Sequence, residues 1–155
     1  LDPCCGDGRM SQQLLRAGRF QEAVLNDLDP QSPAPLHVDA CDPILWQRAG
    51  ADCCVTNPPW TAAGEIAWTA IKYVPIVALL LRVTWGEPCD ASPRAPRNGR
   101  RWLPRRPPHA ELKMDRISYD GAGTDSAPNS WFIWGVQPRI VVVDLAEVGQ
   151  LTLTT

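Results

Sequence analysis

Short apolar runs and amphipathic stretches alternate along the first 85 residues. Met10–Ala17 repeats apolar residues at helical spacing and stops at Gly18, which predicts an amphipathic helix. Apolar runs of strand length follow at Ala23–Leu28, Leu36–Ala40, Asp52–Thr56 and Val74–Arg82. Two more helices are predicted between these strands, over Pro43–Arg48 and Ala62–Lys72. The alternation predicts an α/β fold with a mostly parallel sheet and right-handed crossovers.

The pattern changes after Trp85. Six prolines fall between Glu87 and His109, and they predict a long irregular loop. Three later segments predict strands, the first two of them as an antiparallel pair: Leu112–Tyr119, Trp131–Val136 and Arg139–Leu145. We therefore expect one domain over residues 1–155, with a loop insertion at 87–110. Because the first recognisable motif begins at residue 1 and no starting Met precedes it, we also expect the chain to be truncated at its N-terminus.

The most apolar stretch, Val74–Val83, is about ten residues long and too short to cross a membrane. No secretory signal precedes the first motif, so a soluble, cytoplasmic protein is predicted. The six cysteines form two adjacent pairs plus Cys41 and Cys89, unlike the CxxC spacing of zinc sites. We expect small buried thiols and no metal.

Basic residues gather in one part of a chain whose net charge is only −2. Eight basic and four acidic residues lie between Glu87 and Arg116. Arginines can pair with phosphates, and a tryptophan among them can stack on a base. The predicted nucleic-acid contacts are Arg100, Arg101, Trp102, Arg105 and Arg106. The alternative is a solvated insertion that is basic because the sequence is rich in Ala, Arg and Pro.

The first candidate site is the segment Leu1-Asp2-Pro3-Cys4-Cys5-Gly6-Asp7-Gly8. Glycines two apart at a strand-to-helix turn let the backbone approach a ligand, although an ordinary tight turn has the same pattern. About twenty residues later a predicted strand ends at Asp27, where a carboxylate can accept hydrogen bonds from ribose hydroxyls. The next strand ends at Asp39, which can serve the adenine end of a nucleoside cofactor or be a solvated carboxylate.

The most specific signal is Asn57-Pro58-Pro59-Trp60 after a buried strand. An exocyclic amine is a poor nucleophile because its lone pair is delocalised into the ring. An Asn side-chain carbonyl and a backbone carbonyl can accept both amino hydrogens, and the two prolines keep these acceptors aimed. Trp60 offers a face for a planar base. The alternative is a Pro-Pro turn with a half-buried tryptophan.

In this order the motifs resemble those of class I S-adenosylmethionine-dependent methyltransferases, in particular the amino-methyltransferases of DNA. The resemblance covers Leu1 to about Arg82 and implies a Rossmann-like, three-layer α/β/α sheet with an antiparallel C-terminal hairpin. The cofactor-binding residues that it implies, together with their neighbours, are Asp2, Pro3, Cys5, Gly6, Gly8, Asp27, Leu28, Asp39, Ala40 and Asn57. The implied catalytic residues are Asn57, Pro58, Pro59 and Trp60.

The resemblance implies methyl transfer from S-adenosylmethionine to the N6 amino group of adenine in DNA. A duplex substrate requires that the adenine leave the helix, since Asn57 cannot reach it in the stack. More loosely, segments such as Ser130-Trp131-Phe132-Ile133-Trp134 resemble small phage-type adenine methyltransferases. A bacterial or phage-infected cytoplasm is then the expected setting. The oligomeric state and the recognised DNA sequence are not predicted.

The sequence is also compatible with other functions. The same asparagine motif serves methylation of the cytosine N4 amine, of an RNA base or of a protein glutamine. A catalytically silent cofactor-binding or DNA-binding module is the alternative from another class. Pro88-Cys89 matches the dipeptide of cytosine C5 methylation, but without the surrounding pattern. His37 and His109 are the histidines that hydrolytic catalysis would need.

Overall fold

The computed structural model describes residues 1–86, 103, 105–114, 128–136 and, for the backbone, 139–142. The helices of this part are α1 (Arg9–Arg16), α2 (Pro43–Ala49) and α3 (Ala63–Tyr73), with a 3-10 helix η1 (Val83–Gly86). Its strands are β1 (Cys53–Thr56), β2 (Ile76–Arg82), β3 (Ala110–Lys113), β4 (Asn129–Trp134) and β5 (Arg139–Val142). The three predicted helices are confirmed to within one residue at each end.

The strands form one mixed sheet in the order β1-β2-β4-β3-β5. β1 pairs with β2 and β3 with β5 in parallel, whereas β4 is antiparallel to both of its neighbours. The fold is therefore α/β, and the predicted antiparallel pairing of the two later segments is confirmed. Among these strands the sheet is mixed rather than mostly parallel, because β4 lies between β2 and β3 and reverses both pairings.

Three short segments extend the sheet beyond β1. Leu1 lies next to β1: its amino group donates to the Cys53 carbonyl at 2.8 Å, and its carbonyl accepts from the Val55 amide at 3.1 Å. Asp2 bridges Leu25 in parallel, and Asn26 in turn bridges Leu36 in parallel. Leu1 and Asp2 thus form an extended segment between β1 and the segment around Leu25.

The predicted strands Ala23–Leu28 and Leu36–Ala40 are wrong in extent. The first is paired only through isolated bridges at Leu25 and Asn26, and the second only through one at Leu36. The Asp27 carboxylate accepts from the Asp29 amide at 3.0 Å and turns the chain just after the bridge. The proline-rich crossover that follows has no helix in the structure.

The later strands also begin earlier than predicted. β3 starts at Ala110, which lies in the range predicted as a loop, and β4 starts at Asn129 rather than Trp131. Pairing between the strands sets these boundaries. The His109 amide donates to the Ile133 carbonyl at 2.7 Å, so β3 and β4 pair from Ala110 on, two residues before the apolar pattern of the sequence begins at Leu112. The rest of the predicted strand up to Tyr119 and the loop tip at 87–102 lie outside the described residues.

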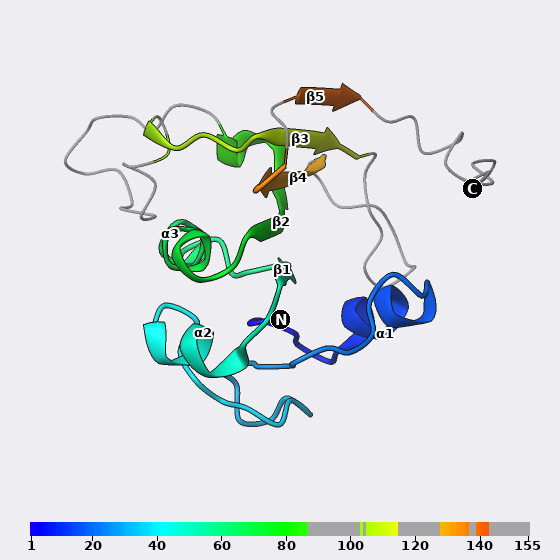
Figure 1. The fold of residues 1–155 in the computed structure, drawn as a ribbon, viewed down its shortest axis with the longest axis vertical. Helices are drawn as coiled ribbons and strands as arrows, with labels where there is room; N and C mark the ends of the chain where they lie inside the picture. The colour runs from blue at the N-terminus through cyan, green and yellow to red at the C-terminus, as the bar shows by residue number, and fades with distance from the viewer. Residues whose placement is uncertain (87–102, 104, 115–127, 137–138, 143–155) are drawn as a thin grey trace.

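Helices lie on both sides of the sheet (Figure 1), with α2 and α3 on one side and α1 on the other. α2 begins where Asp42 accepts from the Ile44 amide at 2.9 Å, and Pro43 is its first residue. Alternate residues of β2 face α3, and their side chains share one core cluster. Its most deeply buried members include Cys54, Ile66, Ala67, Val77, Leu79, Leu81, Trp85 and Phe132. In the described part of the chain, no helix has the length and apolar character to cross a membrane.

Candidate functional site

A cleft of about 590 Å³ opens where the extended segments and β1 and β2 end. That volume is sufficient for a nucleoside-sized ligand. The cleft is lined by Pro3, Cys4, Gly6, Asp27, Leu28, Asp39, Ala40, Asn57, Pro58, Pro59, Trp60, Ala62, Ile66, Leu81, Arg82 and Asn129. All four predicted catalytic residues and seven of the ten predicted cofactor residues are in this set. The remaining three, Asp2, Cys5 and Gly8, are not.

The glycine loop turns sharply before α1. Gly6 and Gly8 have positive φ angles of 56° and 78°, which side chains other than glycine rarely adopt. The Gly8 amide donates to the Cys5 carbonyl at 2.8 Å, and Gly8 is the residue before α1. Gly6 lines the cleft, whereas Gly8 is buried where α1 begins. Gly6 can therefore contact a ligand, and Gly8 forms the turn into the helix.

Asp27 links the glycine loop to the next strand end. Its Oδ2 accepts from the Gly6 amide at 2.7 Å, and its Oδ1 accepts from the Asp29 amide. The Ser32 hydroxyl donates to the Gly6 carbonyl at 2.5 Å from the other side. Because Asp27 is only half-buried, its carboxylate stays accessible from the cleft. Asp39 is exposed, and its Oδ1 accepts from the Cys41 amide at 2.8 Å.

Asn26 fixes the spacing of these strand ends. Its side chain is fully buried. Nδ2 donates to the carbonyls of Pro3 and Val38, and Oδ1 accepts from the Val38 amide, each at 2.9 Å. One amide therefore joins the segments that carry Pro3, Asp27 and Asp39. The sequence marked this position only as the end of a strand.

Asn57 follows β1 directly and is exposed at the cleft. Its side chain forms no hydrogen bond with another described residue, so its carbonyl is available to a ligand. Pro58 is buried, and the Pro59 carbonyl accepts from the amides of Ala62 and Ala63 at the start of α3. The loop is thus anchored on both sides of the exposed asparagine.

Asp2 has a structural position rather than a place in the cleft. It is 2% exposed, and its Oδ2 accepts from the Ser11 hydroxyl in α1 at 2.6 Å. Burial raises the pKa of the Asp2 carboxyl above its ordinary 3.8, and the Ser11 hydrogen bond opposes that rise. The residue fastens α1 to the sheet, and the implied cofactor contact of Asp2 is not seen in this geometry.

Replacing Asp2 with asparagine should make stability less dependent on pH. A raised pKa means that the protonated carboxyl favours the fold below pH 3.8, and that this contribution is lost as pH rises through the folded-state pKa. Relative to Asp2→Asn, the unchanged chain should therefore lose stability between acidic and neutral pH. Urea unfolding of both proteins at pH 4 and pH 7 measures the difference. An equal difference at the two pH values would contradict the assignment.

The cysteines of the described part are free thiols: Cys4, Cys5, Cys41, Cys53 and Cys54. Burial raises the pKa of the Cys4 thiol at the cleft to about 12, and Asp2 and Asp27 add to the rise. Burial likewise raises the pKa of Cys41 to about 12, with Asp39 adding. A thiol that is protonated at neutral pH is a poor nucleophile. Cys89, the residue considered for cytosine C5 chemistry, lies outside the described residues.

Neither histidine considered for hydrolysis lines the cleft. Nδ1 of His37 lies 2.9 Å from the Asp27 carbonyl, and Nδ1 of His109 accepts from the Gly135 amide at 3.0 Å. Both imidazole rings are therefore hydrogen-bonded to backbone groups. Among the residues that the structure describes, no three His, Cys, Asp or Glu side chains are grouped as metal ligands.

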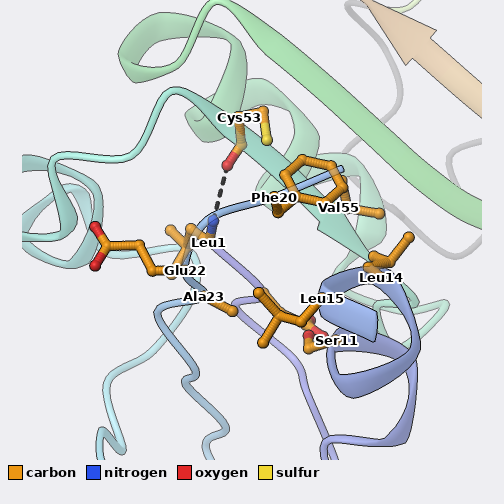
Figure 2. A pocket seen from close by; sticks show the side chains of 10 residues that line it. Leu1, Ser11, Leu14, Leu15, Phe20, Glu22, Ala23, Cys53 and Val55 are labelled. Carbon is orange, nitrogen blue, oxygen red and sulfur yellow. Dashed lines mark hydrogen bonds between the residues drawn. The ribbon is translucent and has the colours of Figure 1, made fainter. Parts of the chain in front are cut away.

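A second, much smaller cavity of about 30 Å³ lies on the α1 side of the sheet. Figure 2 shows apolar side chains of α1 and the strands around it, with the Leu1–Cys53 hydrogen bond at its edge. The cavity has room for only about two water molecules. It is too small for a nucleoside-sized ligand, and the larger cleft is the candidate site.

The predicted basic contacts divide between described and undescribed residues. Arg100, Arg101 and Trp102 lie outside the described residues, whereas Arg105 and Arg106 are exposed. The Arg106 guanidinium lies 5.7 Å from the ring centre of Trp68, which Lys72 also approaches at 4.6 Å. The Arg106 carbonyl accepts from the Trp134 indole at 3.1 Å.

This arrangement places Arg106 away from the cleft. Trp134 is paired with Val77 near the start of β2, whereas the cleft residue Arg82 is at its end. The five residue steps of strand from Val77 to Arg82 span about 17 Å. Arg106 therefore lies beside α3, toward the end of β2 that is opposite the cleft.

Two cleft residues escaped the sequence analysis. Arg82 was seen only as the end of a strand, and Asn129 was placed before the predicted start of β4. Neither belongs to a local motif, because only the β2–β4 pairing brings them together. Comparison with protein-family models, curated proteins and solved structures gives no match to this chain.

Proposed function

We propose that this chain is the S-adenosylmethionine-binding core of a methyltransferase whose substrate is the N6 amino group of adenine in DNA. One observation carries the proposal. The glycine loop, the carboxylate of Asp27 and the exposed amide of Asn57 line the same cleft, although they follow different extended segments of the chain.

The strand arrangement supports the Rossmann-like methyltransferase layout that the resemblance implies. Reading across the sheet, the segments at Leu36, Leu25 and Asp2 precede β1 and β2, and the reversed strand β4 follows. Ligands of open α/β sheets bind beyond the carboxyl ends of the strands. In this sheet the cleft lies beyond those carboxyl ends.

The residues at this edge fit a nucleoside cofactor. The Asp27 carboxylate can accept from ribose hydroxyls, Asp39 and Ala40 lie at the third segment for the adenine end, and the Gly6 backbone is exposed for the methionine end. S-adenosylmethionine supplies an electrophilic methyl group on a sulfonium. The task of the protein is to hold an amine in line with that methyl.

Asn57 and the Pro58 carbonyl are assigned to the amine. Their oxygens can accept both amino hydrogens, which keeps the nitrogen lone pair directed at the methyl group. Trp60 keeps 39% of its surface exposed and can stack on the base, which adds about 1–3 kcal/mol of binding. A flipped adenine from duplex DNA meets both requirements.

The basic segment is proposed to hold the DNA backbone. Changing Arg100, Arg101, Arg105 and Arg106 to glutamine should weaken binding to every duplex sequence, and each lost phosphate contact should lower the salt-dependence slope by about 0.9. Fluorescence anisotropy at several salt concentrations measures both effects. A matched control changes Arg9, Arg16, Arg19 and Arg48, which are exposed elsewhere. Unchanged affinity in the first variant would remove this segment from the DNA contacts.

The substrate class is tested by transfer of a tritiated methyl group to DNA, RNA and protein fractions side by side. We expect label in DNA, recovered as N6-methyladenine. Label recovered as N4-methylcytosine, in RNA or in glutamine would assign the same site to another amine. No label in any fraction, together with cofactor binding, would favour a silent binding module.

A further inference from the structure

We infer that Asn129 and Arg82 complete the substrate half of the cleft: Asn129 donates a hydrogen bond to a ring nitrogen next to the reacting amine, and Arg82 positions Trp60. This inference rests on the proposed function, because it assumes that an amine lies at Asn57. It adds a selection rule for the base, which the asparagine motif alone does not provide.

The two residues are brought together by pairing of distant strands. Arg82 ends β2, Asn129 begins β4, and they are direct partners in the antiparallel ladder. Side chains of direct partners lie on the same face of a sheet. Both residues line the cleft that also holds Asn57 and Trp60.

Asn129 carries a donor without an acceptor. The residue is 3% exposed, and its Nδ2 is buried with no hydrogen-bond partner. Buried polar groups are nearly always paired, so an unpaired one at a cleft calls for a partner from outside the chain. A ligand atom with a lone pair satisfies that amide, whereas an N–H group at the same place would be repelled.

Arg82 holds the stacking residue. Its guanidinium lies 5.0 Å from the ring centre of Trp60, within the range of a cation–π contact. Trp60 is among the exposed large apolar side chains of the described part, so its ring is open to a ligand on the side that Arg82 leaves uncovered. Arg82 is therefore a positioning residue that acts on the base through Trp60.

These contacts select one class of ring. The Asn57 carbonyl requires an amino group, and the Asn129 amide requires an acceptor beside it. Adenine presents N1 next to its N6 amine, and cytosine presents N3 next to its N4 amine. Guanine presents N1–H on the Watson–Crick side of its amine, and its acceptor N3 lies on the sugar side, so it cannot present an acceptor to Asn129 in the orientation that adenine and cytosine adopt.

The test compares 2′-deoxyadenosine with its 1-deaza analogue, which keeps the amine but lacks the ring acceptor. Binding to the chain is measured by titration calorimetry in the presence of S-adenosylhomocysteine, so that no transfer occurs. We expect the analogue to bind about tenfold more weakly to the unchanged chain, as for one lost hydrogen bond. Asn129→Leu should bind both nucleosides equally, at the level of the analogue.

Controls separate binding from folding. Ser130→Ala changes the neighbouring buried residue, whose hydroxyl donates to Glu111 at 2.9 Å, and it should keep the tenfold discrimination. Because Asn129→Leu removes an unpaired buried amide, its thermal midpoint should not fall below that of Ser130→Ala. Arg82→Gln should raise the KM for DNA without changing cofactor affinity, and Arg82→Lys should partly restore it.

The outcomes distinguish the two proposals. Methyl transfer to adenine with equal discrimination in the unchanged chain and in Asn129→Leu would overturn the role of Asn129 and leave the proposed function intact. No discrimination in the unchanged chain would do the same. Failure of both nucleosides to bind, with no methyl transfer to any substrate, would overturn both.

Discussion

Replacing Asn57 with alanine should lower the rate of methyl transfer by about 100- to 1,000-fold, the usual loss when one polar group aimed at the reacting atoms is removed. The Asn57 side chain is exposed at the cleft and is not used by another described residue, so truncation should cost the fold little. Cofactor affinity should change by less than about threefold, because Asp27 and the Gly6 loop are unaffected. Single-turnover transfer to DNA measures the first effect, and calorimetry the second.

Thr61→Ala is the matched control for this experiment. Thr61 is also exposed and lies four residues further along the same loop, but it does not line the cleft. Its substitution should leave the transfer rate within about twofold. Equal rates for Asn57→Ala and Thr61→Ala would remove Asn57 from the chemistry.

Asn26→Ala should lower the free energy of unfolding by about 3–5 kcal/mol, among the largest effects of a single substitution. The change leaves the carbonyls of Pro3 and Val38 and the Val38 amide without their partner, and each unpaired buried group costs about 1–3 kcal/mol. Because these groups hold three strand ends in place, the variant should also bind cofactor more weakly. Urea unfolding followed by circular dichroism measures the stability.

Two further variants show whether the bridging amide is the cause. Asn26→Asp keeps an acceptor for the Val38 amide but cannot donate to the two carbonyls, so it should be destabilised as well. Ser32→Ala removes a half-buried hydroxyl that donates to the Gly6 carbonyl and accepts from the Ala34 amide at 3.2 Å, and should cost about 1–2 kcal/mol. A loss at Asn26→Ala no greater than at Ser32→Ala would show that the strand ends are held by other contacts.

Local pattern predicted the elements whose boundaries are set within the segment itself. α2 has its capping carboxylate and proline at its start, and α3 begins after the paired prolines, so both were found from sequence. The strand β2 was found because its apolar run is long. The two segments near Leu25 and Leu36 were overestimated, since their pairing is limited to isolated bridges at Leu25, Asn26 and Leu36.

The site was predictable where a motif is continuous and hidden where tertiary pairing builds it. Asn57 to Trp60 and Gly6 belong to short motifs, and they line the cleft. Asp2 belongs to the same motif as Gly6, yet its buried carboxylate accepts a hydrogen bond from Ser11 in α1 and does not line the cleft. Arg82 and Asn129 meet only through the β2–β4 register, and no pattern in either segment announces it. Arg106 was predicted from charge as a nucleic-acid contact, and its position beside Trp68 in α3 could not be predicted from the local sequence.

The most direct test of the account is titration of S-adenosylmethionine into the purified chain by calorimetry, with Asp27→Ala as the comparison. If the cleft holds the cofactor, binding saturates at one molecule per chain, and the variant binds at least about tenfold more weakly because the ribose loses its acceptor. Absence of saturable binding at millimolar cofactor, or equal affinity in Asp27→Ala, would contradict it.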